Sequence, residues 1–489
     1  MNPLSSWIHL SLRHLTKKSH AQFLAERGSI QKTQSQILKR LLQQSSTTAW
    51  GREQGVSADW NAHVVAQKLK PTTWQDWEPW VEKEQQGQTN SLAMNVQRFQ
   101  PTSGSTFKRK WIPYTQNFLQ EIDQATAVWM HDLYQTYPGL LQGRHYWSLS
   151  WLPDDLRSQM TNNDLAYFPW LKRQFLAQIM AVPEQVQHAA SAHEAREQTL
   201  QHLIKCRDLS LFFVWSPTFL LGLCEELWER RVVPDATSME EMVQRLWPKL
   251  ALISAWDTAD AAPWAAKIKN LFPHTKFQGK GLFATEAVVT IPVQERPHLA
   301  YSSHYYEFQR TDGVIVPSWE LRGGDKVTPL VSTGSGLWRY QLGDELLVEE
   351  IYQGCPVLQF LGRQQTVDLV GEKLTYQVAR DILQDLGPGA FLILAVQGSD
   401  DARPYYELVW EGAAPAGLSQ RVESLLAEHH HYRLARELGQ LSPLRVHTCQ
   451  SSGHFFRELA EEMGWVLGDM KWEALVKLPH SHKVVAWNP

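Results

Sequence analysis

A short segment rich in hydroxyl groups and cations, at residues 101–113, has the composition of a phosphate-binding loop. Four hydroxyl side chains, one glycine and three cationic side chains fall within residues 102–110. Hydroxyls and free backbone N–H groups can hydrogen-bond phosphate oxygens, glycine lets the backbone approach closely, and lysine neutralises charge. The spacing differs from the common G-x-x-x-x-G-K-[ST] phosphate loop. Taken alone, the segment is consistent with a phosphate-binding loop or with a solvated turn.

Two carboxylates have surroundings that could suit a metal ion or a sugar. Glu286 is the single acidic residue in the apolar run 282–291, and burying a charge is costly unless it is paired or holds a metal. Magnesium in nucleotide sites is typically held by one or two carboxylates and the substrate phosphates. Glu286 is therefore a candidate for Mg²⁺, or a strand-end glutamate that faces water. Asp344 follows Gly343 at the expected end of a strand, where an exposed carboxylate could accept both hydroxyls of a ribose or simply occupy a turn.

A proline-broken apolar segment could line a pocket for an acyl group. Residues 200–231 are predicted to be largely helical, with a break at 214–218 that contains Trp215, Ser216 and Thr218. A plain helix–loop–helix core explains the same pattern and is the interpretation we favour from these residues.

Other motifs give no catalytic or metal site. The tract His429 to His431 cannot converge on one ion, because consecutive helical residues point about 100° apart. We expect these side chains on a solvated helix face. Arg339 stands where a dinucleotide fingerprint that begins at Gly334 would need its third glycine. The chain contains no H-E-x-x-H motif, no G-x-S-x-G motif and no internal repeat.

The predicted secondary structure places the hydroxyl-rich segment between two strands and ahead of a helix. Apolar residues at helical spacing over 29–44 predict an amphipathic helix. Strands are predicted at 96–99 and 111–114, and a helix at 118–133. A further buried strand is predicted at 144–151.

The pattern changes near residues 363–368 to that of a small α+β unit. Its predicted elements are helix 376–386, strands 391–396 and 406–410, a mostly helical stretch 417–441, strand 444–448 and helix 455–463. We therefore predict a first domain at residues 1–363 and a second at 364–489, which is a usual domain size.

Composition excludes several classes of protein. The chain has 489 residues, of which 43% are hydrophobic, enough for more than one domain. A formal charge of -4 provides no basic field for nucleic acid. Four cysteines without a C-x-x-C pair indicate reduced thiols in a cytoplasmic protein. The N-terminus lacks a signal-peptide pattern, and the most apolar run, 211–224, is too short to span a membrane.

Taken in order, these segments resemble the acyl acid–amido synthetase family of the auxin-responsive type, as a bacterial-looking member. This family belongs to the firefly-luciferase-like adenylating superfamily. The most specific of its motifs is similar to Gly336-Leu337-Trp338-Arg339-Tyr340-Gln341-Leu342-Gly343-Asp344. The other similar segments are residues 47–56, 102–113, 284–286, and 360–363 with Asp368 and 371–373.

The resemblance implies an α/β fold, with a large N-terminal adenylating domain of β-sheets and a β-barrel flanked by helices, and a small mobile α+β C-terminal domain. It implies ATP and Mg²⁺, with Glu286 as the metal ligand and Lys471 as a catalytic residue beside Glu286; Lys477 is the fallback for Lys471. The acyl-binding candidates are Trp215, Ser216 and Thr218. The ATP-binding residues that it implies are Ser103, Gly104, Ser105, Thr106, Lys110, Thr285, Glu286, Tyr340, Asp344, Arg363 and Lys373.

The implied reaction is formation of an acyl adenylate from a carboxylic acid, followed by transfer to an amine such as an amino acid. A thiol of coenzyme A or of a carrier protein is the alternative acceptor, and a non-catalytic sensor of nucleotide or acid is the alternative of a different class. Two departures from the family pattern, Phe107 in the loop and Leu282 near the adenine position, keep the sensor open. The motifs leave the acid, the acceptor and the oligomeric state open.

Overall fold

The computed structural model describes residues 3–102, 110–148, 170–363, 366–397, 403–463 and 473–478. These residues form two compact units, and the chain passes from the first unit to the second between Leu361 and Gly362. We expected the second domain to begin at residue 364. Helices and sheets occur in both units, so the mixed α/β class is confirmed.

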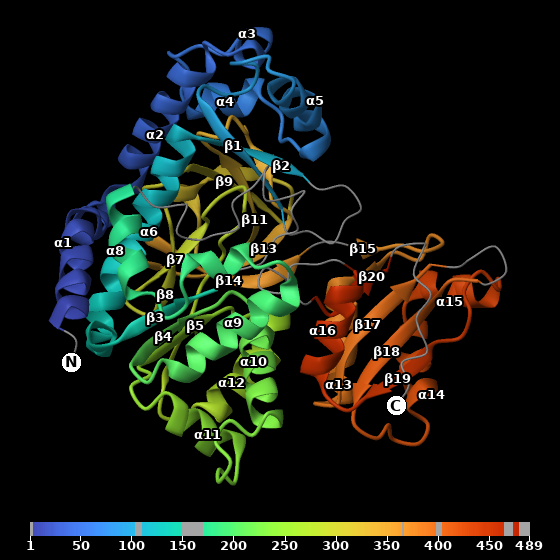
Figure 1. The fold of residues 1–489 in the computed structure, drawn as a ribbon. Coiled ribbons are helices and arrows are strands. Elements are labelled where there is room, and N and C mark those ends of the chain that lie inside the picture. Colours follow the sequence, from blue (N-terminus) through green and yellow to red (C-terminus); the bar gives the residue numbers. More distant parts are fainter. Residues whose placement is uncertain are drawn as a thin grey trace. The chain divides into compact units, whose positions relative to one another are not determined.

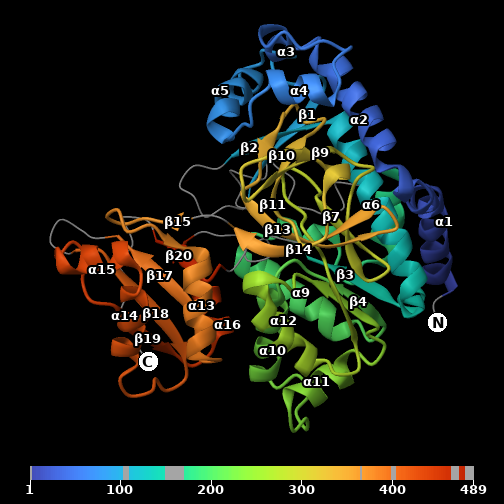
Figure 2. The ribbon, with the colours of Figure 1, turned by 180° about the vertical axis from the view of Figure 1, so that it is seen from behind.

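Long helices at the start of the chain pack around α6 in the first unit. Helix α1 runs beside α6 in both views of the ribbon (Figures 1 and 2). The amphipathic helix predicted at 29–44 is α2, whose apolar residues are buried. The helices of this region are α1 (Pro3–Glu26), α2 (Ile30–Ser45), α3 (Ala49–Glu53), α4 (Ala62–Lys68), α5 (Trp74–Gln85) and α6 (Gln116–Thr136).

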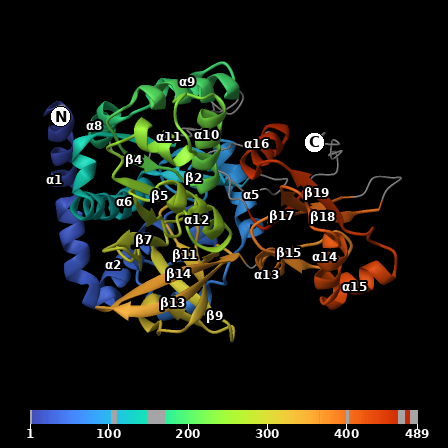
Figure 3. The same cartoon turned by 90° about the horizontal axis from the view of Figure 1, so that it is seen from below.

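A parallel sheet with the order β3-β4-β5-β6 forms one part of the first unit. Its strands are β3 (Arg144–Trp147), β4 (Leu209–Phe213), β5 (Leu252–Ala255) and β6 (Lys276–Gly279). Figure 3 shows helices around this sheet; they are α8 (Trp170–Ile179), α9 (Ala192–Lys205), α10 (Pro217–Glu229), α11 (Met239–Leu246) and α12 (Ala262–Leu271).

The strand β4 corrects one prediction. Residues 200–231 were expected to be largely helical, but β4 lies in the middle of them and every one of its residues is buried. A short, uniformly apolar run has no periodicity of its own, so sequence alone cannot distinguish a buried strand from a buried helix. The strand at 144–151 is confirmed for Arg144–Trp147.

A second, antiparallel sheet contains the strands that precede the second unit. Its order is β10-β9-β11-β13-β14-β8-β7, with β12 paired to β11. The strands are β7 (Thr290–Val293), β8 (Arg296–Leu299), β9 (Tyr305–Arg310), β10 (Ile315–Pro317), β11 (Lys326–Ser332), β12 (Tyr340–Gln341), β13 (Asp344–Tyr352) and β14 (Cys355–Arg363). A separate hairpin joins β1 (Val96–Pro101) to β2 (Trp111–Thr115), as predicted.

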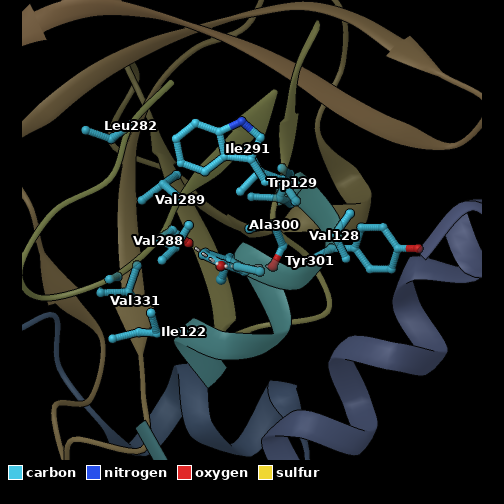
Figure 4. Close-up of a cluster of buried hydrophobic side chains, with 14 of the residues drawn as sticks. Ile122, Val128, Trp129, Leu282, Val288, Val289, Ile291, Ala300, Tyr301 and Val331 are labelled. Atoms are coloured by element: carbon cyan, nitrogen blue, oxygen red, sulfur yellow. Dashed lines mark hydrogen bonds between the residues drawn. The ribbon is translucent and has the colours of Figure 1, made fainter. Parts of the chain in front are cut away.

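Helix α6 contributes a continuous apolar face to the core of the first unit. Figure 4 shows Ile122, Val128 and Trp129 of α6 among side chains from β7 and β11. Burial of such side chains contributes about 1.5–3 kcal/mol each. Helix α6 is therefore held firmly against the strands that carry the candidate site residues.

The second unit has its own core and a four-stranded sheet with the order β19-β18-β17-β20. Strands β17 (Ala390–Val396) and β18 (Tyr405–Glu411) are antiparallel, and β19 (Arg445–Cys449) and β20 (Leu475–Lys477) join in parallel. The other elements are β15 (Thr366–Val367), β16 (Leu374–Thr375), α13 (Tyr376–Leu386), α14 (Leu418–Ala427), α15 (His430–Glu437) and α16 (Ser452–Glu462). The predicted α+β pattern is confirmed, and the tract His429 to His431 is exposed.

The cysteines and the lengths of the described helices bear on two of the predictions. All four cysteines are free thiols, and Cys206, Cys224 and Cys355 are buried. Among the helices in the described part of the chain, none combines the length and the apolar character needed to cross a bilayer.

Candidate functional site

The β1–β2 hairpin supports the base of the hydroxyl-rich segment. Pro101 pairs with Trp111, and the Thr102 N–H donates to the Lys110 carbonyl at 2.9 Å. Ser103, Gly104, Ser105, Thr106 and Phe107 lie outside the described residues. The predicted phosphate-binding role of this loop therefore remains a prediction, whereas its strand–loop–strand support is confirmed.

Lys110 joins this hairpin to a second candidate segment. Its ammonium Nζ lies 3.1 Å from the hydroxyl of Tyr340, on β12. Tyr340 is buried, and its backbone pairs with Val331 of β11. Two predicted ATP-binding residues that lie 230 positions apart are thus in direct contact.

Thr285 and Glu286 occupy a tight turn directly before β7. Phe283 bridges to Val288, and the Ala284 N–H donates to the Ala287 carbonyl at 2.9 Å. The hydroxyl of Tyr114, on β2, donates to the Thr285 carbonyl at 3.0 Å. Strand β2 therefore holds the tip of this turn as well as the base of the hydroxyl-rich loop.

Glu286 is half-buried at the tip of the turn. Across the residues that the structure describes, its carboxylate forms neither a hydrogen bond nor an ion pair, and these residues hold no cluster of three or more metal-ligating side chains. A single accessible carboxylate suits a magnesium ion that takes its remaining ligands from phosphates and water.

The segment that contains Tyr340, residues 333–344, is also tied to the start of α6. The Thr115 hydroxyl, at the N-cap of α6, donates to the Gly334 carbonyl at 2.7 Å. Gly336 has φ +97°, and a side chain there would meet the Leu92 carbonyl at 2.8 Å. Only glycine fits this turn without strain.

The exposure and the position of Asp344 differ from what we predicted. We expected an exposed carboxylate at the end of a strand, but Asp344 is only 1% exposed and begins β13. The preceding Gly343 has φ +77°, so the chain turns before Asp344 and carries it into the sheet. Its predicted contact with a ribose remains a prediction.

Arg339 is a buried structural cation within the same motif. Its Nε lies 2.8 Å and its Nη2 3.0 Å from the two carboxylate oxygens of Glu307, on β9. Its Nη1 donates to the carbonyls of Leu69 and, at 3.3 Å, Ala66. Burial raises the pKa of Glu307 while Arg339 lowers it. This arginine therefore links the β12 segment to α4.

The predicted acyl-binding residues follow β4, at the carboxyl end of the parallel sheet. In open α/β sheets, ligands commonly bind at this edge. The buried hydroxyls of Ser216 and Thr218 lie 2.6 Å from each other. The Trp215 ring lies 5.3 Å from the ring of Phe283, which adjoins the turn that bears Thr285. Trp215 is thus close to the nucleotide candidates, while the two hydroxyls satisfy one another.

An aromatic group surrounds a buried lysine next to Trp215. Lys280 directly follows β6 and is fully buried. Its Nζ lies 4.6 Å from the ring centre of Trp215 and 4.9 Å from that of Trp129. Aromatic faces attract cations, and these rings surround the Nζ of Lys280 at this edge of the sheet.

The second unit holds the remaining predicted residues. Arg363 forms an ion pair with Glu473 at 3.3 Å, and Lys373 is exposed. Lys477 donates from Nζ to the Asp368 carbonyl at 2.5 Å, which ties β20 to the segment after β15. Lys471 lies outside the described residues. In this structure Lys477 therefore has a structural contact, and both lysine assignments remain predictions.

Tyr114, Glu121 and His304 contribute to this region but were absent from the predictions. Glu121 could have been noticed, because it shares the helical face of Phe118, Ile122 and Ala125, where a charge is unexpected. Tyr114 and His304 had no comparable signal, since their roles depend on contacts with residues far away in the sequence.

Comparisons with known proteins find relatives of this chain. The model of the GH3 family N-terminal domain matches residues 20–232, and that of the GH3 family central domain matches residues 298–363. Indole-3-acetic acid-amido synthetase GH3.15 of Arabidopsis thaliana is 27% identical over 168 residues, which cover 29% of this chain. That alignment spans only 27% of the relative's own length.

Solved structures show the same fold over nearly the whole chain. AtGH3.15 acyl acid amido synthetase in complex with 2,4-DB has a TM-score of 0.76 at 15% identity, covering 95% of this chain and 94% of that one. 2-Hydroxyisobutyryl-CoA ligase in complex with 2-HIB-AMP has a TM-score of 0.50 at 14% identity, covering 88% and 91%. The two domain models together match more than half of the residues, and the protein belongs to the GH3 family.

Proposed function

We propose that the protein is an ATP-dependent acyl acid–amido synthetase. One observation carries this proposal: Lys110, β2 and the start of α6 contact two separate segments that contain candidates for nucleotide binding, the turn at residues 284–287 and residues 333–344. Lys110 contacts Tyr340, Tyr114 contacts Thr285, and Thr115 contacts Gly334. Adenylating enzymes among the structural relatives share the fold. A binding site commonly draws its groups from several distant segments, and here the segments that meet are those that carry the candidate residues.

In the proposed first step, a carboxylate oxygen of the acid attacks the α-phosphorus of ATP. The bond between the α-phosphorus and the bridging oxygen breaks, and pyrophosphate leaves. The protein's own part is to align the two reactants and to neutralise phosphate charge. Lys110 and the hydroxyls of residues 103–106 would bind phosphates, and Lys471 would stabilise charge on the α-phosphate.

Glu286 is the residue that would hold Mg²⁺, which supplies positive charge to the phosphates when bound. The donor set fits, since Glu286 offers an accessible carboxylate at the tip of a turn held by Tyr114. Asp344 and Arg363 would contact the ribose, and Lys373 the phosphates, as the family pattern implies.

In the second step, the nitrogen of an amine attacks the acyl carbonyl carbon, an amide bond forms and AMP leaves. An amino acid is the proposed amine. The aromatic side chains around Trp215 support an acid with an aromatic or apolar body. Four free thiols agree with a reducing, cytoplasmic location.

Exchange of labelled pyrophosphate into ATP, measured over a panel of aryl, indolyl and aliphatic acids, tests the first step. Acid-dependent exchange supports adenylation. Product formation is then compared between reactions supplied with amino acids and reactions supplied with coenzyme A, which identifies the acceptor. If the product is a thioester and not an amide, the proposed activity changes from amido synthetase to acyl-CoA ligase. If folded protein neither exchanges nor binds ATP, the enzyme proposal fails.

Glu286→Gln provides a sharper test, with Asp312→Asn as its matched control. Asp312 is an exposed carboxylate in the turn between β9 and β10 of the antiparallel sheet. Loss of a metal ligand should lower exchange at least about tenfold and raise the magnesium requirement. The Asp312 variant should behave as wild type. Equal effects in both variants would remove Glu286 from the metal site.

A further inference from the structure

A buried carboxylate on α6, that of Glu121, connects two of the candidate segments. Glu121 is 2% exposed. One oxygen, Oε1, accepts from Arg40 of α2 at 2.8 Å. The other, Oε2, accepts from His304 Nδ1 at 2.8 Å and from the Gly334 backbone N–H at 2.9 Å. Three donors from three parts of the chain thus converge on a single side chain.

The contacts of His304 define which ring nitrogen carries its proton. The ring is fully buried, and its Nε2 lies 3.1 Å from the backbone N–H of Val288. A backbone N–H can only donate, so Nε2 must offer a lone pair. The proton therefore lies on Nδ1 and is donated to Glu121. The imidazole of His304 therefore bridges the Glu121 carboxylate and the backbone N–H of Val288.

Both backbone amides belong to turns of the candidate site. Val288 closes the turn that carries Thr285 and Glu286, and its carbonyl accepts from the Tyr306 hydroxyl at 2.6 Å. Gly334 lies in the turn closed by the hydrogen bond from Thr333 N–H to the Leu337 carbonyl at 3.0 Å. Val288 and Gly334 are therefore each held at both the backbone N–H and the backbone C=O.

We propose that Glu121 and His304 are positioning residues of the adenylation site. They set the spacing between the turn at residues 284–287 and the turn at residues 333–337, and they hold both turns to the start of α6. This inference rests on the proposed function. Neither residue is proposed to touch ATP or the acid; both act through Val288 and Gly334.

Charge pairing alone does not explain this arrangement. Buried ionic groups seldom stabilise a fold more than apolar residues of similar volume would. Here the hydrogen bonds are directional and end on backbone amides of two turns, one beside the proposed magnesium ligand and one beside Tyr340. Fixing groups within a few tenths of an ångström is what binding of a metal–nucleotide complex requires.

Two substitutions of His304 separate positioning from simple packing. In His304→Asn the amide nitrogen can replace Nδ1 as donor to Glu121, but Val288 loses its acceptor. In His304→Gln the longer side chain can place an oxygen near the former Nε2 and accept from Val288. The Asn variant should raise the KM for MgATP about tenfold, with a smaller change in the KM for the acid. The KM for MgATP of the Gln variant should lie between those of the wild type and of the Asn variant.

His298→Gln is the matched control. His298 is an equally buried histidine on β8 of the same unit. Its ring nitrogens hydrogen-bond nothing in the described residues. This variant should change thermal stability without a specific change in the KM for MgATP.

Hydrogen exchange of backbone amides provides a readout independent of activity. The amide of Val288 should exchange faster in His304→Asn, and the amide of Gly334 in Glu121→Gln, with the remaining amides of α6 protected as in wild type. The inference is overturned if the variants lose stability while these amides and the KM for MgATP stay as in wild type, or if His298→Gln reproduces their effects. A wild-type protein that neither exchanges pyrophosphate nor binds ATP would instead defeat the proposed function.

Discussion

Replacing Arg339 with methionine removes the cation from a buried ion pair and leaves the carboxylate of Glu307 inside the protein. Arg339 is 3% and Glu307 4% exposed. Two hydrogen bonds join them, at 2.8 and 3.0 Å, and Nη1 also donates to the carbonyls of Ala66 and Leu69 at the end of α4. Breaking one side of a buried pair costs about 3–5 kcal/mol, because the remaining charge has no partner.

That cost is large compared with the free energy of unfolding of a typical domain, which is about 5–15 kcal/mol. Urea unfolding of Arg339→Met, Glu307→Gln and the double variant would measure it. Methionine keeps much of the arginine stem's volume, so the loss reports mainly on charge and hydrogen bonding. The double variant should be less destabilised than the two single changes predict together, since it leaves no unpaired charge buried.

The destabilisation caused by Arg339→Met should also depend on pH. Burial raises the pKa of the Glu307 carboxyl, and Arg339 opposes that rise. Without Arg339 the pKa of the folded state moves further up, so the folded protein takes up a proton more readily than the unfolded chain. The destabilisation should therefore be smaller at about pH 5 than at about pH 8. A cost below about 1 kcal/mol, or one that does not change with pH, would refute this reasoning.

Two further predictions concern single side chains. Lys110→Met should raise the KM for MgATP about tenfold in pyrophosphate exchange, because it removes a charge beside the proposed phosphate loop; an unchanged KM would exclude Lys110 from the site. Burial lowers the pKa of His298 from 6.5 to about 4, so its contribution to stability is present above about pH 6.5 and is lost as the pH falls toward 4. The loss amounts to about 3 kcal/mol, and urea unfolding of His298→Gln over this range should show a correspondingly flatter profile.

Much of the local structure was predictable from residues near one another. The amphipathic pattern at 29–44 became α2, and the pattern at 376–386 became α13. The hydroxyl-rich segment does lie between paired strands. In each case the signal is a short-range periodicity, which depends only on backbone geometry.

The errors arise where burial depends on distant partners. Strand β4 was interpreted as helix, because an apolar run buried between β3 and β5 has no polar face to reveal its period. Asp344 was expected at the surface, but it begins a strand inside the antiparallel sheet. Neither outcome follows from the local sequence.

The types and the order of the chemical groups can be read from the sequence alone: the hydroxyl-rich loop, the Thr285–Glu286 pair, the motif ending at Asp344 and the lysines near the end of the chain. The order of these groups resembles that of an adenylating family, and that resemblance is the source of the predicted chemistry. Which of these groups come into contact depends on the folded chain. Lys110 reaches Tyr340, and the Glu121 carboxylate contacts Gly334 directly and Val288 through His304. These contacts form because α6 and the β1–β2 hairpin pack against the antiparallel sheet, which brings residues 183 to 230 positions apart into hydrogen-bonding distance.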